Sequence, residues 1–155
     1  MNKEFMQVAI DTAIDNIKIN NGGPFGAVIV KDGKLIAKSP NTVTTSNDPT
    51  AHAEINAIRL ACKVLNTFDL SGCEIYSSCE PCPMCLSAIY WARISKVYYA
   101  ADRFDAKDAG FDDSFIYNEI SLSDGERSIY MENIMKKEGE SPFELWKEAE
   151  NKTQY

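Results

Sequence analysis

Three cysteines, at positions 79, 82 and 85, fall within the stretch SSCEPCPMC at residues 77–85. The stretch follows a strand-like run, CEIYSS, and leads into a helical pattern whose first turn accommodates Pro83. Cysteines at C-x-x-C spacing are typical of a redox dithiol, a structural zinc site or part of a catalytic metal site. The run by itself leaves these three alternatives open.

The one histidine of the chain favours the catalytic metal site. His52 stands in the sequence AHAE, where a second helical pattern begins, and the PCPMC run follows it along the chain. H-x-E followed by P-C-x-x-C is the signature of zinc deaminases, in which the histidine and both cysteines hold the metal. Three ligands, His52, Cys82 and Cys85, leave the fourth tetrahedral position for water. We therefore expect Glu54 beside the metal, where it can move protons without being a ligand.

The spacing of the cysteines suits this role. Cys82 and Cys85 are three residues apart, so they face the same way on a helix, and the positive end of the helix dipole favours their thiolates. Cys79 is left over, and we expect it to pack at the end of the strand. Cys62 and Cys73 are expected to be buried apolar side chains.

Hydrophobic periodicity predicts an α/β chain. Apolar residues from Met6 to Ile17 follow helical spacing, and the runs FGAVIV and KLIAKS are expected to form a hairpin around an Asp-Gly turn. From residue 51 to 101 the order is helix, strand, helix, strand. The two strands should therefore pair in parallel within a layered α/β sheet.

The last third of the chain has a weaker pattern. Residues 112–120 are typical of a short helix, and residues 128–134 are compatible with an edge strand. A terminal helix is expected at 141–152, opened by Ser141 and Pro142.

Length and composition fit one domain over residues 1–155. Apolar residues make up 45% of the chain, enough for a core that needs no stabilising metal. The net charge of −7, from 16 basic and 23 acidic residues, argues against a nucleic-acid partner, and no apolar run is long enough for a membrane span. The odd number of cysteines and the charged N-terminus, which lacks a signal-peptide pattern, lead us to expect a reducing cytoplasm.

The residues around these motifs resemble the cytidine-deaminase superfamily, and within it the small bacterial guanine deaminases. The resemblance covers nearly the whole chain, through GGPFGAVIVKDG, NDPTAHAEINAIR, SCEPCPMC, AIYWAR, GFDDSFIY and SPFELW with the terminal tyrosine. One departure is Ser87, where glycine is expected in these enzymes; serine is also small and should fit. The resemblance implies a three-layer α/β/α sandwich around a mixed five-stranded sheet.

The resemblance also implies an activity, a cofactor and a partner. It implies one Zn²⁺ per subunit and the hydrolytic deamination of guanine, a small purine base, to xanthine and ammonia. It further implies a homodimer in which the C-terminal segment, about residues 130–155, is exchanged between the two subunits.

By the same resemblance, particular side chains surround the substrate. The expected catalytic residues are Glu54 and Asp113, and the expected substrate-binding residues are Phe25, Asn41, Ala53, Trp91 and, from the second subunit, Tyr155. Without the resemblance these residues have ordinary interpretations. Asn41 suits a turn, the aromatic residues suit a core, Asp113 lies in an acidic loop, and a terminal Tyr155 is usually frayed.

Three other functions stay open from the sequence. A tRNA adenosine deaminase would share the metal motif but should carry a basic face, and residues 104–117 differ from the small, glycine-rich stretch expected there. A cytosine or cytidine deaminase is disfavoured on the same grounds. A zinc-stabilised interaction module would use Cys79 as a fourth ligand, would not need Glu54 and would unfold with a chelator.

Overall fold

The computed structural model of the protein describes residues 1–154. Two compact units follow each other along the chain: the first comprises Met1–Asp113, and the second begins at Ser114. Among the helices of the described residues, none combines the length and the apolar character needed to cross a membrane.

The first unit contains a mixed sheet with the strand order β2-β1-β3-β4. The strands are β1 (Gly26–Lys31), β2 (Lys34–Pro40), β3 (Cys73–Cys79) and β4 (Lys96–Ala101). β1 is antiparallel to both β2 and β3, whereas β3 and β4 are parallel. The parallel pair expected from the helix–strand–helix–strand order is therefore confirmed.

A tight turn joins β1 to β2. Asp32 and Gly33 both have positive φ angles, 50° and 72°, as a type I′ turn requires, and Lys31 pairs with Lys34. The backbone twist of such a turn matches the twist of the strands, so the Asp-Gly pair sets the register next to the turn. Further along the hairpin the register shifts between Ile29 and Val30.

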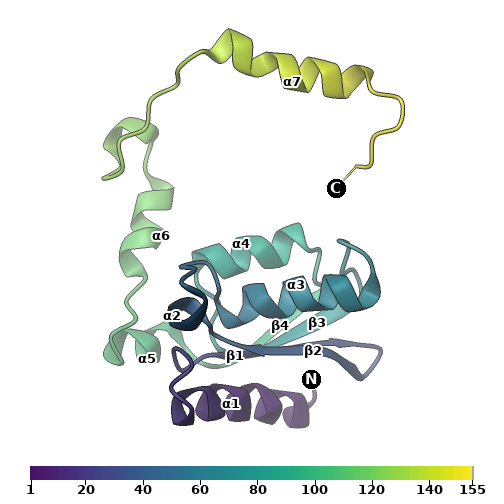
Figure 1. Cartoon of the computed structure of the whole chain (residues 1–155). Helices are drawn as coiled ribbons and strands as arrows, with labels where there is room; N and C mark the ends of the chain where they lie inside the picture. The colour runs from purple at the N-terminus through teal and green to yellow at the C-terminus, as the bar shows by residue number, and fades with distance from the viewer. Residues whose placement is uncertain (155) are drawn as a thin grey trace. The chain divides into compact units, whose positions relative to one another are not determined.

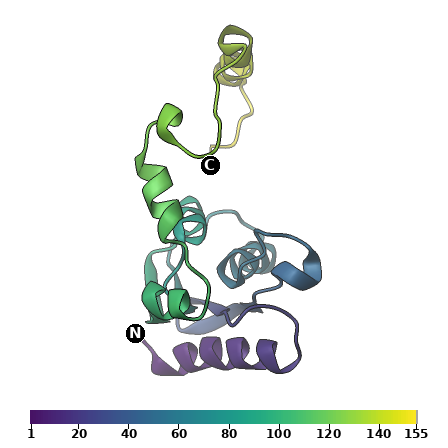
Figure 2. The ribbon, with the colours of Figure 1, turned by 90° about the vertical axis from the view of Figure 1, so that its left-hand side faces the viewer.

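Helices cover both faces of the sheet, as Figures 1 and 2 show from two directions. α1 (Lys3–Lys18) lies on one face, and α3 (Ala53–Leu65) and α4 (Pro83–Trp91) lie on the other. β1 is consequently buried on both sides. Val28 packs with α1 residues, whereas Ile29 belongs to the core formed with α3 and α4. The predicted α/β/α layering is thus present in the first unit.

Gly26 allows α1 to lie close to the start of β1. A Cβ atom at this position would overlap the carbonyl oxygen of Ala9 and would lie 2.8 Å from the backbone nitrogen of Ala13. The close approach brings the connection between α1 and β1 against the sheet, and this connection borders the site described below.

The sheet has one strand fewer than expected. Residues 128–134 form bends and irregular backbone instead of the predicted edge strand, so the sheet of the described residues has four strands rather than five. A strand persists where a neighbour satisfies its backbone hydrogen bonds. The sheet pairings of the described chain include no partner for residues 128–134.

The second unit is helical. It contains α6 (Ser114–Ser121), the 3-10 turn η1 (Asp124–Glu126) and α7 (Lys136–Glu148). α7 begins before the predicted start at Ser141, and Pro142 lies inside the helix rather than in its first turn. The lysines and glutamates ahead of Ser141 are good helix formers, which explains the earlier start.

Two short helices were not predicted. α2 (Val43–Ser46) lies in the polar loop after β2, and α5 (Arg103–Asp108) follows β4. α5 begins with a capping box formed by Asp102 and Asp105. Neither segment is long enough for hydrophobic periodicity to reveal it.

Candidate active site

Two helices direct their N-termini to one place. His52 is the N-cap of α3 and Cys82 is the N-cap of α4, and both have an extended backbone, with φ and ψ of −67° and 156° and of −63° and 168°. Neither side chain caps its own helix, so the imidazole and the thiol are available to bind something else. Pro83 opens α4, and Cys85 lies in its first turn.

His52, Cys82 and Cys85 form a compact cluster. Nδ1 of His52 lies 3.6 Å from Sγ of Cys82 and 3.5 Å from Sγ of Cys85, and the three ligand atoms all lie within 4.8 Å of one another. A tetrahedral zinc ion with bonds of about 2.3 Å to sulfur and about 2.0 Å to nitrogen places these atoms about 3.5 Å apart. The cluster therefore fits one zinc ion, held through Nδ1 and two sulfur atoms. Three protein ligands are typical of a catalytic rather than a structural zinc site.

Glu54 is buried beside the metal cluster. Its Oε1 accepts a hydrogen bond from the hydroxyl of Ser77 (3.1 Å), and its Oε2 accepts one from the thiol of Cys85 (3.4 Å). Burial raises the pKa of the Glu54 carboxyl, and the charge of Cys82 raises it further. A carboxyl group with a raised pKa binds a proton more readily, as a proton shuttle requires.

In the metal-free state the ligands hold different numbers of protons. A hydrogen bond from Cys85 lowers the pKa of Cys82 to about 4, against the opposing effect of burial. The same bond, together with burial, raises the pKa of Cys85. The hydrogen bond with Cys82 raises the pKa of His52. Metal binding must displace these protons, so metal affinity should increase with pH.

Asn41 follows β2, and its amide has a fixed orientation. Its Oδ1 accepts hydrogen bonds from the backbone N–H groups of Gly23 (3.3 Å) and Val43 (3.2 Å). Asn16 holds the backbone, because its Nδ2 donates to the carbonyl oxygens of Asn41 (2.8 Å) and Gly23 (2.9 Å). With Oδ1 occupied, Nδ2 of Asn41 is left to donate to a bound molecule.

A cavity of about 400 Å³ adjoins the metal cluster. Its lining includes His52, Glu54 and Cys82 together with Phe25, Asn41 and Asp113. The ring of Phe25 packs edge-on against Phe111, with centroids 5.0 Å apart and an interplanar angle of 84°. The volume lies within the range of about 300–1,000 Å³ found for small-molecule sites, and the aromatic wall suits a planar ring.

Asp113 contributes a second carboxyl group to this cavity. Burial raises its pKa, the charge of Cys82 adds to the rise, and Arg103 partly offsets it. The adjacent Asp112 forms an ion pair with Lys107 (3.1 Å). The charge of Cys82 in the metal cluster therefore acts on the Asp113 carboxyl.

Residues 1–101 match the family described as the cytidine and deoxycytidylate deaminase zinc-binding region. The chain belongs to this deaminase family. Its sequence is 56% identical over 156 residues to the guanine deaminase of Bacillus subtilis (strain 168), and the match covers 100% of both chains. The X-ray structure of guanine deaminase from Bacillus subtilis superimposes with a TM-score of 0.97 at 55% identity, covering 100% of this chain and 99% of that chain.

Other deaminase relatives match part of the chain. The tRNA-specific adenosine deaminase of Aquifex aeolicus (strain VF5) is 51% identical over 87 residues, which is 56% of each chain. A crystal structure of a mutant protein in complex with 8-azaguanine has a TM-score of 0.67 at 36% identity, covering 70% of this chain and 63% of that chain. The full-length similarity to guanine deaminase confirms the family resemblance of the sequence, whereas this tRNA deaminase match extends over about half of the chain.

Two predicted substrate-binding residues, Ala53 and Trp91, are not among the described residues that line this cavity. Ala53 is buried in the first turn of α3, directly after His52. Trp91 ends α4, is 70% exposed and lines a separate hollow with Arg93. Tyr155 lies outside the described residues. The substrate contacts of Ala53, Trp91 and Tyr155 stay predictions.

Cys79 lies apart from the metal ligands, as expected. Its thiol donates to the carbonyl oxygen of Asp102 (3.5 Å), and burial raises the pKa of Cys79 to about 11. In the part of the chain that the structure describes, the group able to hold a metal consists of His52, Cys82 and Cys85. The four-ligand structural site of an interaction module, with Cys79 as a ligand, is therefore not formed.

Among the residues that contact predicted site residues, Ser77 and Phe111 were not predicted. Ser77 stands two residues before Cys79 on β3, so strand alternation places both on the same face, and this pattern could have identified it. Phe111 follows α5 and packs on Phe25. Phe111 belongs to the family-like stretch GFDDSFIY, but its packing depends on the loop after an unpredicted helix.

Proposed function

We propose that this chain is a zinc-dependent guanine deaminase, which converts guanine and water to xanthine and ammonia. The observation that carries the proposal is the pairing, in one cavity, of the zinc-deaminase cluster with an oriented amide donor, Asn41, and a carboxyl group, Asp113. The full-length similarity to a guanine deaminase supports the same substrate.

Hydrogen-bond complementarity explains the choice of base. Guanine presents a carbonyl oxygen and a ring nitrogen as acceptors on one edge, and Nδ2 of Asn41 can donate to them. Its ring N–H and amino groups are donors, for which the Asp113 carboxylate is an acceptor. Adenine carries an amino group where guanine has the carbonyl, and it would bring a donor against the Asn41 donor. Phe25 provides a flat face for the purine ring.

The reaction replaces the 2-amino group of guanine by an oxygen atom from water, so a C–O bond forms and a C–N bond breaks. Zinc, when held by His52, Cys82 and Cys85, lowers the pKa of water so that it acts as a nucleophile near neutral pH. Glu54 takes a proton from the water and delivers protons to the neighbouring ring nitrogen and to the leaving amine. Asp113, which also lines the cavity, assists proton transfer.

We place the enzyme in a reducing cytoplasm. All five cysteines are unpaired, and Cys82 in its thiolate form reacts readily with oxidants. A reducing compartment preserves both sulfur ligands for zinc.

A homodimer with exchanged C-terminal segments, about residues 130–155, completes the proposal. Within α7, Phe143 is 68% exposed and Leu145 is 67% exposed, and α7 has no buried residue among those described. Exposed apolar side chains on one helix are typical of a protein contact. Tyr155 of one subunit would then contact the substrate bound to the other.

A substrate panel tests the proposed reaction. Ammonia release is measured from guanine, adenine, cytosine, cytidine and tRNA with zinc-loaded protein. We expect release from guanine, with xanthine as the second product. Release from tRNA or cytosine in place of guanine would contradict the proposal and would move the substrate to those classes.

Complementation between subunits tests the exchange. A chain lacking residues 150–155 and a full-length Glu54→Gln chain should each be inactive but folded. When they are refolded together, the site with intact Glu54 can receive the intact C-terminus of its partner, and activity should return. Full activity of the truncated chain alone, or a monomeric mass in light scattering, would contradict the exchange.

A further inference from the structure

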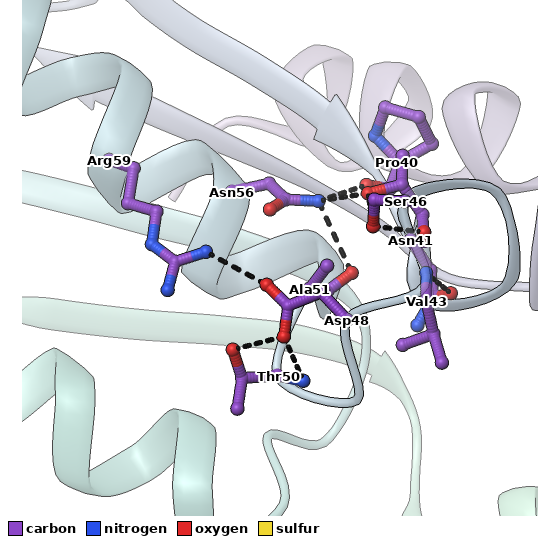
Figure 3. A network of polar contacts seen from close by, with 10 residues as sticks. Pro40, Asn41, Val43, Ser46, Asp48, Thr50, Ala51, Asn56 and Arg59 are labelled. Atoms are coloured by element: carbon purple, nitrogen blue, oxygen red, sulfur yellow. Dashed lines mark hydrogen bonds and ion pairs between the residues drawn. The ribbon is translucent and has the colours of Figure 1, made fainter.

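Asn56 reaches from α3 to two loop segments that border the cavity (Figure 3). It lies one turn after His52, whose carbonyl oxygen accepts the Asn56 backbone N–H at 3.0 Å. Its side-chain Nδ2 lies 3.2 Å from the carbonyl oxygen of Pro40, 3.0 Å from the hydroxyl oxygen of Thr42 and 3.2 Å from the carbonyl oxygen of Ala51. These three acceptors share the two N–H groups of one amide.

The acceptors flank the residues of the site. Pro40 and Thr42 stand directly before and after Asn41, and Ala51 stands directly before His52. The backbone N–H of Thr42 also donates to the carbonyl oxygen of Ala51 at 3.0 Å. The segment that carries the amide donor and the segment that carries a metal ligand therefore meet at the side chain of Asn56.

We infer that Asn56 is a positioning residue, which fixes the Asn41 amide relative to the reacting centre. Asn56 belongs to α3, which has His52 as its N-cap and contains Glu54. The backbone hydrogen bonds of this helix hold the three residues in a fixed arrangement. Its bonds to residues 40 and 42 therefore set the position of Asn41 with respect to α3. The inference rests on the proposed function, because the carbonyl group of guanine is the acceptor assigned to Asn41.

A second contact between α3 and the loop that joins it to β2 supplies a matched control. Arg59 forms an ion pair with Asp48 (3.6 Å), and Asp48 also accepts the backbone N–H of Thr50 (2.8 Å). The two charged side chains are 56% and 37% exposed, and pairs of this kind contribute little. This ion pair holds the loop at residues 48–50 rather than at the residues next to Asn41.

A double-mutant cycle with Asn56→Ala and Asn41→Ala tests the inference. For each variant, kcat and KM for guanine, zinc content and melting temperature are measured. Alanine is the best helix former, so α3 should persist. We expect Asn56→Ala to raise KM about 10-fold, with a smaller change in kcat and unchanged zinc content. With Asn41 already replaced, Asn56→Ala should cost no more than about twofold.

The Arg59→Gln control separates a role of Asn56 in positioning Asn41 from a general role in holding the loop. Arg59→Gln should change KM by less than about twofold. Additive losses in the double variant, or an equal loss in Arg59→Gln, would overturn the inference, because Asn56 would then act on the fold and not through Asn41. If Asn56→Ala does not fold, Thr42→Val replaces it in the cycle. Valine keeps the shape of threonine and removes the hydroxyl acceptor of the Asn56 amide. The effects of Thr42→Val and Asn41→Ala should again be non-additive.

A failure of the proposed function is recognised in the wild-type protein, before any variant is compared. If the wild-type protein does not deaminate guanine, the proposed substrate is wrong. The same cycle is then measured with whichever base of the panel is deaminated, and additivity or non-additivity with Asn41→Ala still decides the role of Asn56.

Discussion

The hydroxyl of Ser77 on β3 donates a hydrogen bond of 3.1 Å to Oε1 of Glu54, and both side chains are buried. The bond favours the charged form of the carboxyl and so counteracts the rise in the pKa of Glu54 that burial causes. Ser77 thus tunes and orients the group that we propose to move the protons.

Replacing Ser77 by alanine should therefore change the pH dependence of the enzyme. Without the bond the pKa of Glu54 rises further, so the carboxylate forms at higher pH and the acidic limb of kcat/KM shifts upward. We also expect kcat at neutral pH to fall about 10-fold and stability to fall by about 1 kcal/mol. A pH–rate profile for guanine measures the shift.

Ser78→Ala is the matched control for this prediction. The neighbouring hydroxyl accepts the backbone N–H of Gly26 (3.0 Å) and does not bond to Glu54. Its removal should reduce stability without moving the acidic limb. An equal shift in both variants would show that the effect comes from the strand and not from the bond to Glu54.

Replacing Gly26 by alanine should destabilise the first unit. The added Cβ would overlap the carbonyl oxygen of Ala9, so α1 must move away from β1. Such overpacking costs about 1–3 kcal/mol, measured as the free energy of unfolding in urea. Gly125→Ala serves as the comparison, because nothing lies within 4 Å of its Cβ position; equal stability of the two variants would contradict the packing argument.

Removing the metal should make one cysteine selectively reactive. The pKa of Cys82 lies near 4 in the metal-free site, whereas that of Cys79 is raised to about 11 and that of Cys85 is raised as well. After chelation at pH 7, iodoacetamide should modify Cys82 first, and added zinc should protect it. Peptide mass spectrometry identifies the modified residue. Preferential labelling of Cys79 would contradict the assignment of the ligands.

Much of the first unit could be predicted from local sequence. The Asp-Gly turn has one favoured geometry and sets the pairing of the strand residues next to it. The alternation of helix and strand from 51 to 101 leads to the parallel pair. The ligand cluster was also predictable, because His52 and Cys82 each stand where a helical pattern begins. Short-range signals of this kind determine local backbone geometry directly.

The remaining features depend on contacts that no local pattern encodes. The side chains of residues 128–134 are compatible with a strand, yet a strand needs a neighbouring strand. No strand of the described chain pairs with this segment. The amide of Asn56 and the hydroxyl of Ser77 gain their roles from segments that are distant in the sequence. The local sequence around such polar residues does not indicate their hydrogen-bond partners, which only the folded chain brings close.

The most direct test of the account is the turnover of guanine by zinc-loaded wild-type and Glu54→Gln proteins, measured with their zinc content. Glutamine keeps the shape of the side chain but cannot accept a proton, and Glu54 is not among the metal ligands. We predict equal zinc content and a loss of turnover of about 10²–10⁴-fold, the usual contribution of a general acid–base group. Turnover that persists in the Glu54→Gln protein with zinc bound would contradict the central claim that Glu54 moves the protons.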